Sequence, residues 1–316
     1  MRLLLVKTSS LGDVIHNLPV VSDIRRHFPE AAIDWCVEDS FAAIPRLHPA
    51  VEEVIPVAIR RWRKQLFARQ TWQDVSTFRA QIGREAYDLV IDTQGLLKSA
   101  LVARQARGTR CGYDAASARE PLATRFYDRC FAVDVCLHAV ARNRLLAAKA
   151  LGYSPEGEPD YGIVAPPSRF PGCPQGPYAV LLTATSRDDK LWPEAHWIAL
   201  GKSLHGAGIT ALLPGGSPVE RERAARLAEA IPDAVAVPPM RIGELAGLLA
   251  GARLAVGVDT GLSHLAVALR VPTVALYVAT DPGLTGVLGS AFHRNLGGKG
   301  LLPSPDDVVS ALAPVL

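Results

Sequence analysis

An aspartate, Asp13, stands where the pattern of a buried strand changes into that of a helix. The apolar run Leu3–Val6 precedes it, and Ser10 and Gly12 lie in the intervening turn. As a structural residue, Asp13 or Ser10 would cap the helix. As a functional residue, Asp13 would be a general base kept ionised by the helix N-terminus, and Gly12 would let a substrate approach the backbone. The motif alone leaves both interpretations open.

A second turn of this kind occurs within GVDTGLSHLAVAL, residues 257–269. Asp259, Thr260 and Gly261 follow an apolar strand pattern and precede a helix pattern. The free amides at a helix N-terminus can bind an anion, and Gly261 allows close approach. His264, in the first turn, could add an imidazole donor. The same residues could instead cap a buried helix.

A third polar turn, TSRDDK, follows the apolar run at 178–183. Thr185 and Ser186 are small donors, and Lys190 is a point charge suited to a phosphate. Asp188 and Asp189 could suggest a metal site, but adjacent aspartates before a helix more often cap it. We therefore predict no metal site.

Two further segments carry charge at predicted loop positions. Glu220, in the first turn of a helix that begins at Pro218, either interacts with the helix dipole or accepts hydrogen bonds from a ribose. The stretch Ile59–Arg69 has five positive charges around Trp62 and Phe67. It is either a solvated surface or the rim of an anion site, and its composition also suits a membrane surface.

The amino-acid composition limits the classes of protein to which the chain can belong. The 316 residues are 49% hydrophobic and 21% charged, as in a globular protein with an ample core. A net charge of +3 is too small to predict nucleic-acid binding. The five cysteines are scattered and lack metal-ligand spacing, and no apolar run could cross a bilayer or act as a signal peptide. We therefore expect a reduced, cytoplasmic chain without metal.

Alternating strand and helix patterns predict α/β architecture with parallel sheets. In the first half, strands are expected at Arg2–Val6, Ile33–Val37, Val54–Val57 and Leu89–Asp92, and helices at Asp13–Phe28, Trp72–Glu85, Gly95–Arg107 and His138–Leu151. In the second half, strands are expected at Tyr178–Thr183, Ile209–Leu213, Val235–Val237, Leu254–Val258 and Thr273–Tyr277, and helices at Pro193–His205, Pro218–Ala230, Ile242–Ala250, Gly261–Leu269 and from Pro305, capped by Ser304.

A stretch rich in proline and glycine separates two doubly wound units. We predict an N-terminal Rossmann-like domain at 1–160, a linker at 161–177 and a C-terminal Rossmann-like domain at 178–316, whose last helix could pack back on the first domain. Ligands of such sheets lie beyond the carboxyl ends of the strands, so two facing domains would share a central cleft.

Taken in order, the segments KTSSLGDVIHNLP, RRWRK, SAREPLA, TSRDDKLWP and DTGLSHL with TDPGLTG resemble the bacterial lipopolysaccharide heptosyltransferases of glycosyltransferase family 9. The resemblance covers nearly the whole chain and is greatest to the type I enzymes. It implies the two-domain glycosyltransferase B fold. It also implies metal-independent, inverting transfer of heptose from ADP-L-glycero-β-D-manno-heptose to the inner Kdo of Kdo2-lipid A.

The resemblance also assigns roles to residues. It implies that Asp13 is the catalytic base. The implied donor contacts are Thr185, Ser186, Lys190, Glu220, Met240, Asp259, Thr260, Gly261 and His264. The implied acceptor contacts are Lys7, Ser10, Gly12, Arg60, Arg61, Lys64 and Arg119.

Because the acceptor is a membrane lipid, we expect peripheral association with the cytoplasmic face of the inner membrane. Neither a cofactor nor an obligate protein partner is expected. Two alternatives stay open: a type II heptosyltransferase using a heptosylated acceptor, and a sugar-nucleotide epimerase of similar fold. A non-catalytic binding module for a nucleotide sugar is a further, weaker alternative.

Overall fold

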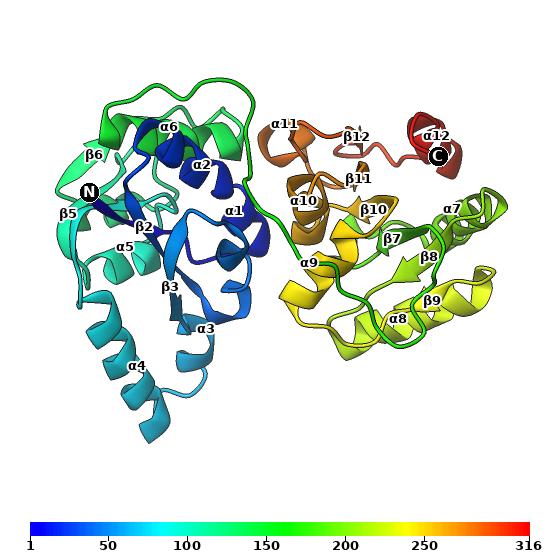
Figure 1. The fold of residues 1–316 in the computed structure, drawn as a ribbon, viewed down its shortest axis with the longest axis horizontal. Coiled ribbons are helices and arrows are strands. Elements are labelled where there is room, and N and C mark those ends of the chain that lie inside the picture. The colour runs from blue at the N-terminus through cyan, green and yellow to red at the C-terminus, as the bar shows by residue number, and fades with distance from the viewer. The chain divides into compact units, whose positions relative to one another are not determined.

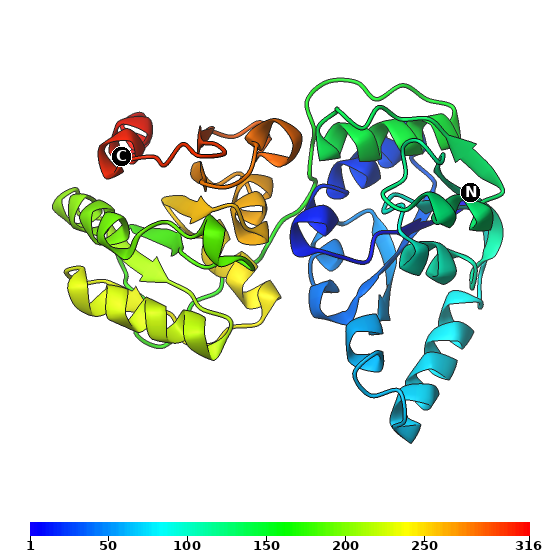
Figure 2. The same cartoon turned by 180° about the vertical axis from the view of Figure 1, so that it is seen from behind.

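A computed structural model describes all 316 residues and divides into two compact units, Met1–Ile163 and Val164–Leu316. Each unit contains one six-stranded parallel sheet with helices on both faces (Figures 1 and 2). The predicted α/β class with two Rossmann-like sheets is therefore confirmed. The boundary between the units falls inside the segment 161–177 that we predicted as a linker.

The first unit alternates strands and helices along most of its length. Its strands are β1 (Arg2–Val6), β2 (Ala32–Glu38), β3 (Val51–Val57), β4 (Ala86–Asp92), β5 (Arg107–Tyr113) and β6 (Arg129–Phe131). Its helices are α1 (Leu11–Ile15), α2 (Leu18–His27), α3 (Ile59–Trp62), α4 (Arg69–Ile82), α5 (Leu97–Ala103) and α6 (Ala139–Leu151).

The first sheet has the strand order β3-β2-β1-β4-β5-β6. Leu4 and Val6 of β1 face a buried cluster that includes Phe78 of α4 and Val102 of α5. Alternate residues of a strand point to opposite faces, so Leu3 and Leu5 face the other side, where α2 packs with α6. Because β1 is buried on both faces, it reads as a continuous apolar run.

The second unit repeats the alternation. Its strands are β7 (Tyr178–Leu182), β8 (Thr210–Leu213), β9 (Val235–Ala236), β10 (Leu254–Val258), β11 (Thr273–Tyr277) and β12 (His293–Gly297). Its helices are α7 (Glu194–Gly206), α8 (Pro218–Ala230), α9 (Ile242–Ala250), α10 (Gly261–Ala268), α11 (Pro282–Thr285) and α12 (Pro305–Leu312).

The second sheet has the order β12-β11-β10-β7-β8-β9. Counted from the first strand of each unit, the two sheets share one order, in which the first and fourth strands are neighbours. The chain leaves these two central strands in opposite directions, which creates a topological switch point at their carboxyl ends.

The final helix belongs to the second unit. Ser304 caps α12 as predicted, and its Oγ accepts a hydrogen bond from the Asp307 amide. Val308 and Leu312 are fully buried in the cluster that also contains Trp197 of α7. The apolar face of α12 is therefore buried within the second unit.

Other differences are local. The predicted helix Asp13–Phe28 is interrupted at His16 and Asn17, and the predicted helix Gly95–Arg107 is limited to α5. Strands β5, β6 and β12 were not predicted because their sequences are polar and partly exposed. No helix has both the length and the apolar character needed to cross a bilayer.

Candidate functional site

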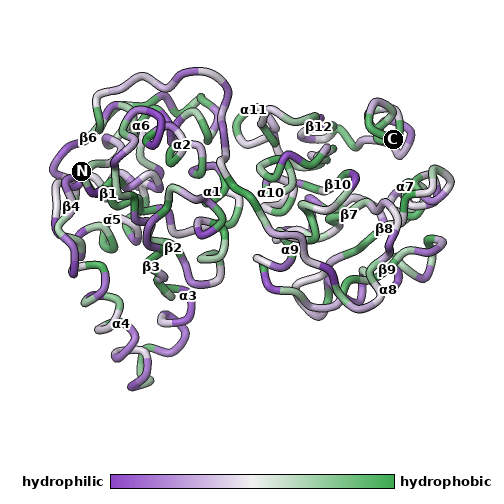
Figure 3. Tube along the Cα trace, viewed as in Figure 1, coloured by the Kyte–Doolittle hydropathy of each residue, from purple (hydrophilic) through white to green (hydrophobic).

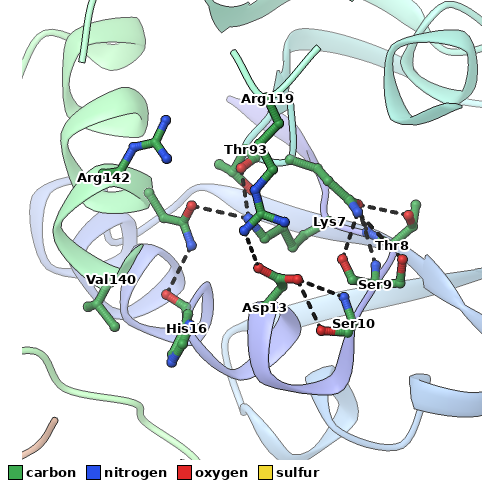
Figure 4. A network of polar contacts seen from close by, with 12 residues as sticks. Lys7, Thr8, Ser9, Ser10, Asp13, His16, Thr93, Arg119, Val140 and Arg142 are labelled. Atoms are coloured by element: carbon green, nitrogen blue, oxygen red, sulfur yellow. Dashed lines mark hydrogen bonds and ion pairs between the residues drawn. The ribbon is translucent and has the colours of Figure 1, made fainter. Parts of the chain in front are cut away.

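The first candidate site lies at the switch point of the first sheet. Strands β1 and β4 are paired, with Val6 opposite Asp92. The loops that follow them, 7–10 and 93–96, therefore emerge side by side at the carboxyl edge. Every residue of the first polar network comes from these loops or from segments that pack against them (Figure 4).

Asp13 is held from two directions. Its Oδ2 accepts hydrogen bonds from the Ser10 amide at 2.9 Å and from Ser10 Oγ at 3.1 Å. Its Oδ1 accepts one from a guanidinium nitrogen of Arg119 at 2.7 Å. Asp13 thus caps α1, as the structural interpretation held, and is also paired with a residue distant in sequence (Figure 4).

The charge of Asp13 is strongly favoured. Its side chain is only 17% exposed, and burial by itself would raise the pKa. The positive charges of Lys7 and Arg119, with the hydrogen bonds from Ser10 and Arg119, outweigh burial and hold the pKa well below its usual range. Asp13 is therefore an ionised carboxylate that is mostly shielded from solvent.

Lys7 lies near this carboxylate (Figure 4). It is 3% exposed, and its Nζ donates to the Thr93 carbonyl at 2.8 Å and to Asn143 Oδ1 at 3.2 Å. Burial lowers its pKa to about 8, against the opposing attraction of Asp13. Lys7 lines a small concavity of about 250 Å³, counted with its solvent-open space, together with Thr93, Gln94, Tyr113, Arg119, Ala139, Arg142 and Asn143.

Two residues that the sequence did not reveal hold the loop before Asp13. Gln94 Oε1 accepts from the Thr8 amide at 2.7 Å, and its Nε2 donates to the Ser9 carbonyl at 2.6 Å. Lys98 Nζ donates to Ser9 Oγ at 2.7 Å. Because Gln94 follows the apolar strand β4, its position at a strand end was the available signal.

The remaining predicted acceptor residues separate into two groups. Gly12 lies in α1 beside Asp13. Arg60 remains at the carboxyl edge, where its amide donates to Glu38 Oε1 at 2.9 Å and its guanidinium lies over Phe41. Arg61 and Lys64 lie outside the Asp13 network: Arg61 pairs with Asp74 of α4 at 2.6 Å, and Lys64 is exposed.

The second candidate site lies at the switch point of the second sheet, where β7 and β10 are paired. Asp259, directly after β10, is its centre. Asp259 Oδ2 accepts from Lys190 Nζ and from Thr280 Oγ1, both at 2.7 Å, and its carbonyl accepts from Thr185 Oγ1 at 3.0 Å. Three predicted residues thus meet, together with Thr280, which was not predicted.

Helix α10 begins immediately after Asp259. Thr260 is its N-cap and makes no side-chain capping bond, and Gly261 is its first residue. His264 is buried in the first turn. Close packing onto β10 requires Gly257, because a Cβ there would lie 2.3 Å from Ser263 Oγ. This packing brings the N-terminal amides of α10 to the switch point, where they suit an anion.

Glu220 serves as a capping residue of α8. Its Oε2 accepts from the amides of Gly216 at 2.8 Å and Ser217 at 3.0 Å, while its own amide donates to Ser217 Oγ. Glu220 Oε2 therefore has the structural, capping role. Ser186 is exposed in the loop after β7, and half-buried Met240 precedes α9. Neither joins the Asp259 cluster.

No group of three or more histidine, cysteine, aspartate or glutamate side chains is arranged to hold a metal ion. Asp188 and Asp189 instead form a short 3₁₀ turn, and Asp189 pairs with Arg187.

Comparison with known proteins decides the family. The sequence pattern described as glycosyltransferase family 9 (heptosyltransferase) matches residues 75–300. Lipopolysaccharide heptosyltransferase 1 of Escherichia coli strain K12 is 50% identical over 291 residues, which cover 92% of this chain and 91% of that protein. The chain belongs to glycosyltransferase family 9.

A second relative and a solved structure agree with this assignment. Lipopolysaccharide heptosyltransferase 1 of Pseudomonas aeruginosa is 50% identical over 291 residues, covering 92% of this family 9 chain and 82% of that protein. The structure described as E. coli heptosyltransferase WaaC with ADP matches with a TM-score of 0.91 at 44% identity, covering 100% of both chains. The predicted glycosyltransferase B fold is thereby confirmed, and this family 9 chain is a heptosyltransferase.

Proposed function

We propose that the chain transfers L-glycero-D-manno-heptose from ADP-heptose to the inner Kdo of Kdo2-lipid A, with inversion and without a metal or cofactor. The proposal rests on one observation: at the switch point of the first sheet, Lys7 and Arg119 keep the Asp13 carboxylate ionised although it is largely buried. The names of relatives about 50% identical, and the ADP in the similar solved structure, support the choice of acceptor and donor.

Asp13 would act as the base. The acceptor hydroxyl oxygen attacks the anomeric carbon of heptose, its proton passes to a carboxylate oxygen of Asp13, and the bond to the ADP oxygen breaks. A single displacement of this kind inverts the anomeric centre. One base suffices, because ADP leaves as a stable anion and needs no protein acid, unlike the leaving groups of glycosidases.

The second switch point would receive the donor. The amides at the start of α10 and the Lys190 ammonium carry the positive character that a diphosphate requires as its negative charge grows. The pair between Lys190 and Asp259 fixes the ammonium at this edge before the substrate binds. Glu220 Oε1 would accept a hydrogen bond from the ribose, and the donor site would be completed by Thr185, Ser186, Met240, Thr260 and His264.

The acceptor side would use the basic residues of the first unit. Arg119 contacts Asp13 directly, and Arg60 lies at the same carboxyl edge. Arg61 and Lys64 would meet the anionic lipid farther out. We expect the enzyme to work at the cytoplasmic face of the inner membrane, without a nucleic acid or an obligate protein partner.

The alternatives predict different products. A type II enzyme would require an acceptor that already carries heptose, and an epimerase would convert the donor with no lipid present. Incubation with ADP-heptose and Kdo2-lipid A, followed by mass measurement of the lipid, separates them. Addition of one heptose to Kdo2-lipid A supports the proposal, and donor conversion without acceptor contradicts it.

Asp13→Asn tests the mechanism. The amide keeps the size of the side chain but cannot accept the proton, so we expect transfer to fall by about 10² to 10⁴. Binding of ADP, measured by titration calorimetry, should be unchanged because the donor contacts lie in the other unit. The matched control is Asp306→Asn, which removes an exposed carboxylate from α12. Near-normal turnover of Asp13→Asn would exclude Asp13 as the base.

A further inference from the structure

The loop 63–68 between α3 and α4 carries apolar side chains that the first unit leaves uncovered. Phe67 is fully exposed, Trp72 is 62% exposed and Leu66 is 52% exposed. A single exposed apolar residue is ordinary in a folded protein. Helices α3 and α4 and the loop between them form a hairpin. Three exposed apolar side chains that lie close in sequence, at one end of this hairpin, indicate an interaction surface. Figures 1 and 2 show this loop at the end of α4 farthest from the sheet.

Hydrogen bonds hold the loop in this form. Trp72 Nε1 donates to the Leu66 carbonyl at 2.9 Å, and Thr71 Oγ1 donates to the Gln65 carbonyl at 2.8 Å. The Ala68 amide also donates to the Gln65 carbonyl. Phe67 is thus presented outward by a defined turn, so its exposure is a property of the fold.

The charged residues of the segment that contains the loop all have one sign. From Ile59 to Arg69 the sequence has five basic residues and no acidic one. Arg61 is neutralised by Asp74, whereas Arg63, Lys64 and Arg69 are exposed and flank the apolar side chains. Figure 3 shows hydrophilic and hydrophobic segments side by side at this end of the hairpin.

We propose that this loop docks on an anionic lipid bilayer, with Phe67 and Leu66 inserted at the level of the headgroups and Arg63, Lys64 and Arg69 against lipid phosphates. Aromatic and basic side chains together suit the interface between membrane and water. The inference deepens the proposed function, which requires a membrane lipid as acceptor. It concerns a surface separate from the Asp13 network.

The hairpin is attached to the edge of the sheet where the proposed reaction takes place. Helix α3 directly follows β3, and the Arg60 amide donates to Glu38 Oε1 at 2.9 Å. This bond fixes the hairpin to the carboxyl edge of the sheet that carries Asp13. A bilayer that holds the loop therefore keeps the reacting edge of the first unit beside the lipid surface.

Co-sedimentation with vesicles tests the proposal in the absence of acceptor. The vesicles are phosphatidylethanolamine mixed with phosphatidylglycerol, and neutral phosphatidylcholine vesicles serve for comparison. We expect the full chain to prefer the anionic vesicles. The double variant Leu66→Ser, Phe67→Ser should bind at least about tenfold more weakly. Val219→Ser, which removes an exposed apolar side chain from α8, is the matched control and should bind normally.

The contribution of the basic residues and the insertion of the apolar side chains are measured separately. Arg63→Gln with Arg69→Gln should weaken binding at low salt and change it little at high salt, since salt screens exposed charges. Trp72 emission should shift to shorter wavelength on anionic vesicles, and Trp72→Phe should abolish the shift. Equal binding to both kinds of vesicle, or undiminished binding by Leu66→Ser, Phe67→Ser, would overturn the proposal.

Activity distinguishes this inference from the proposed function. With a deacylated, water-soluble acceptor, kcat/KM of the double serine variant should equal that of the parent chain. With acceptor embedded in vesicles it should fall. Equal loss with both acceptors would overturn the docking role. Absence of heptose transfer by the parent chain would overturn the proposed function while leaving vesicle binding to be judged by itself.

Discussion

At the scale of single residues, Asp13 combines burial with an ionised state. Burial alone would raise its pKa, and the two nearby cations lower it. Stabilising the carboxylate also lowers its basicity. Arg119 is the partner able to adjust this balance, because it is 45% exposed and reaches Asp13 from another loop. Lys7, in contrast, is fixed by Thr93 and Asn143.

Arg119→Met should therefore change the pH dependence of transfer. Removing the guanidinium raises the pKa of Asp13, so more of the base is protonated at a given acidic pH. We expect the acidic limb of the kcat/KM profile to move to higher pH by about 1 to 3 units. Arg119→Lys should restore much of the original profile. Arg125→Met, at an exposed arginine of the same unit, is the control, and an unshifted profile for Arg119→Met would contradict the role assigned to Arg119.

The sequence predicted part of the two candidate sites and could not predict the rest. Asp13, Asp259 and Lys190 were found because each follows an apolar strand, where the chain turns at the carboxyl edge. Gln94 and Lys98 were not predicted: the position of Gln94 at a strand end was a signal, but nothing in the sequence shows that either side chain bonds to the loop after β1. The sequence could not decide between the two interpretations of Glu220, because a capping carboxylate and a ribose-binding carboxylate occupy the same position in the first turn of a helix.

At the scale of elements, continuous apolar runs predicted β1, β10 and β11 with correct bounds. Strands β5 and β12 were missed because RGTRCGY and HRNLG lack such a run. Their pairing depends on the neighbouring strand, β4 or β11, and not on their own composition. A local run of apolar residues is thus sufficient to predict a strand in the centre of a parallel sheet, and it is insufficient for strands toward the edge.

The contact between α10 and β10 provides a test at this scale. Gly257→Ala places a Cβ 2.3 Å from Ser263 Oγ and 2.9 Å from Leu182 Cβ, so the helix must move. We expect a loss of about 1 to 3 kcal/mol in the free energy of unfolding. ADP should bind more weakly, because α10 carries the amides of the proposed donor site. Chemical denaturation and titration calorimetry measure the two effects.

Gly206→Ala is the matched control, since a Cβ at this end of α7 meets nothing within 4 Å. It should leave both stability and ADP binding nearly unchanged. If Gly257→Ala lowers stability without affecting ADP, then α10 is a structural helix and the proposed donor site is misplaced.

At the scale of the whole molecule, one sheet topology occurs twice with different residues at the switch point. The first unit places a carboxylate between cations there, and the second places a lysine and the start of a helix. Each sheet also has its own buried clusters. The proposed division of labour, with the base in one unit and the donor site in the other, follows from this repetition.

Separate cores, together with the proposed donor site in the second unit, predict how ADP affects unfolding. Scanning calorimetry should resolve two transitions, and ADP at a hundred times its Kd should raise only that of the second unit. The added stability is about 2.7 kcal/mol, which corresponds to a shift on the order of 5 to 10 °C for a unit of this size. Gly257→Ala identifies this transition by lowering it, and Asp13→Asn should leave its response to ADP unchanged. Equal shifts of both transitions would mean that the units unfold together or that both bind the nucleotide, and would contradict a donor site formed by the second unit alone.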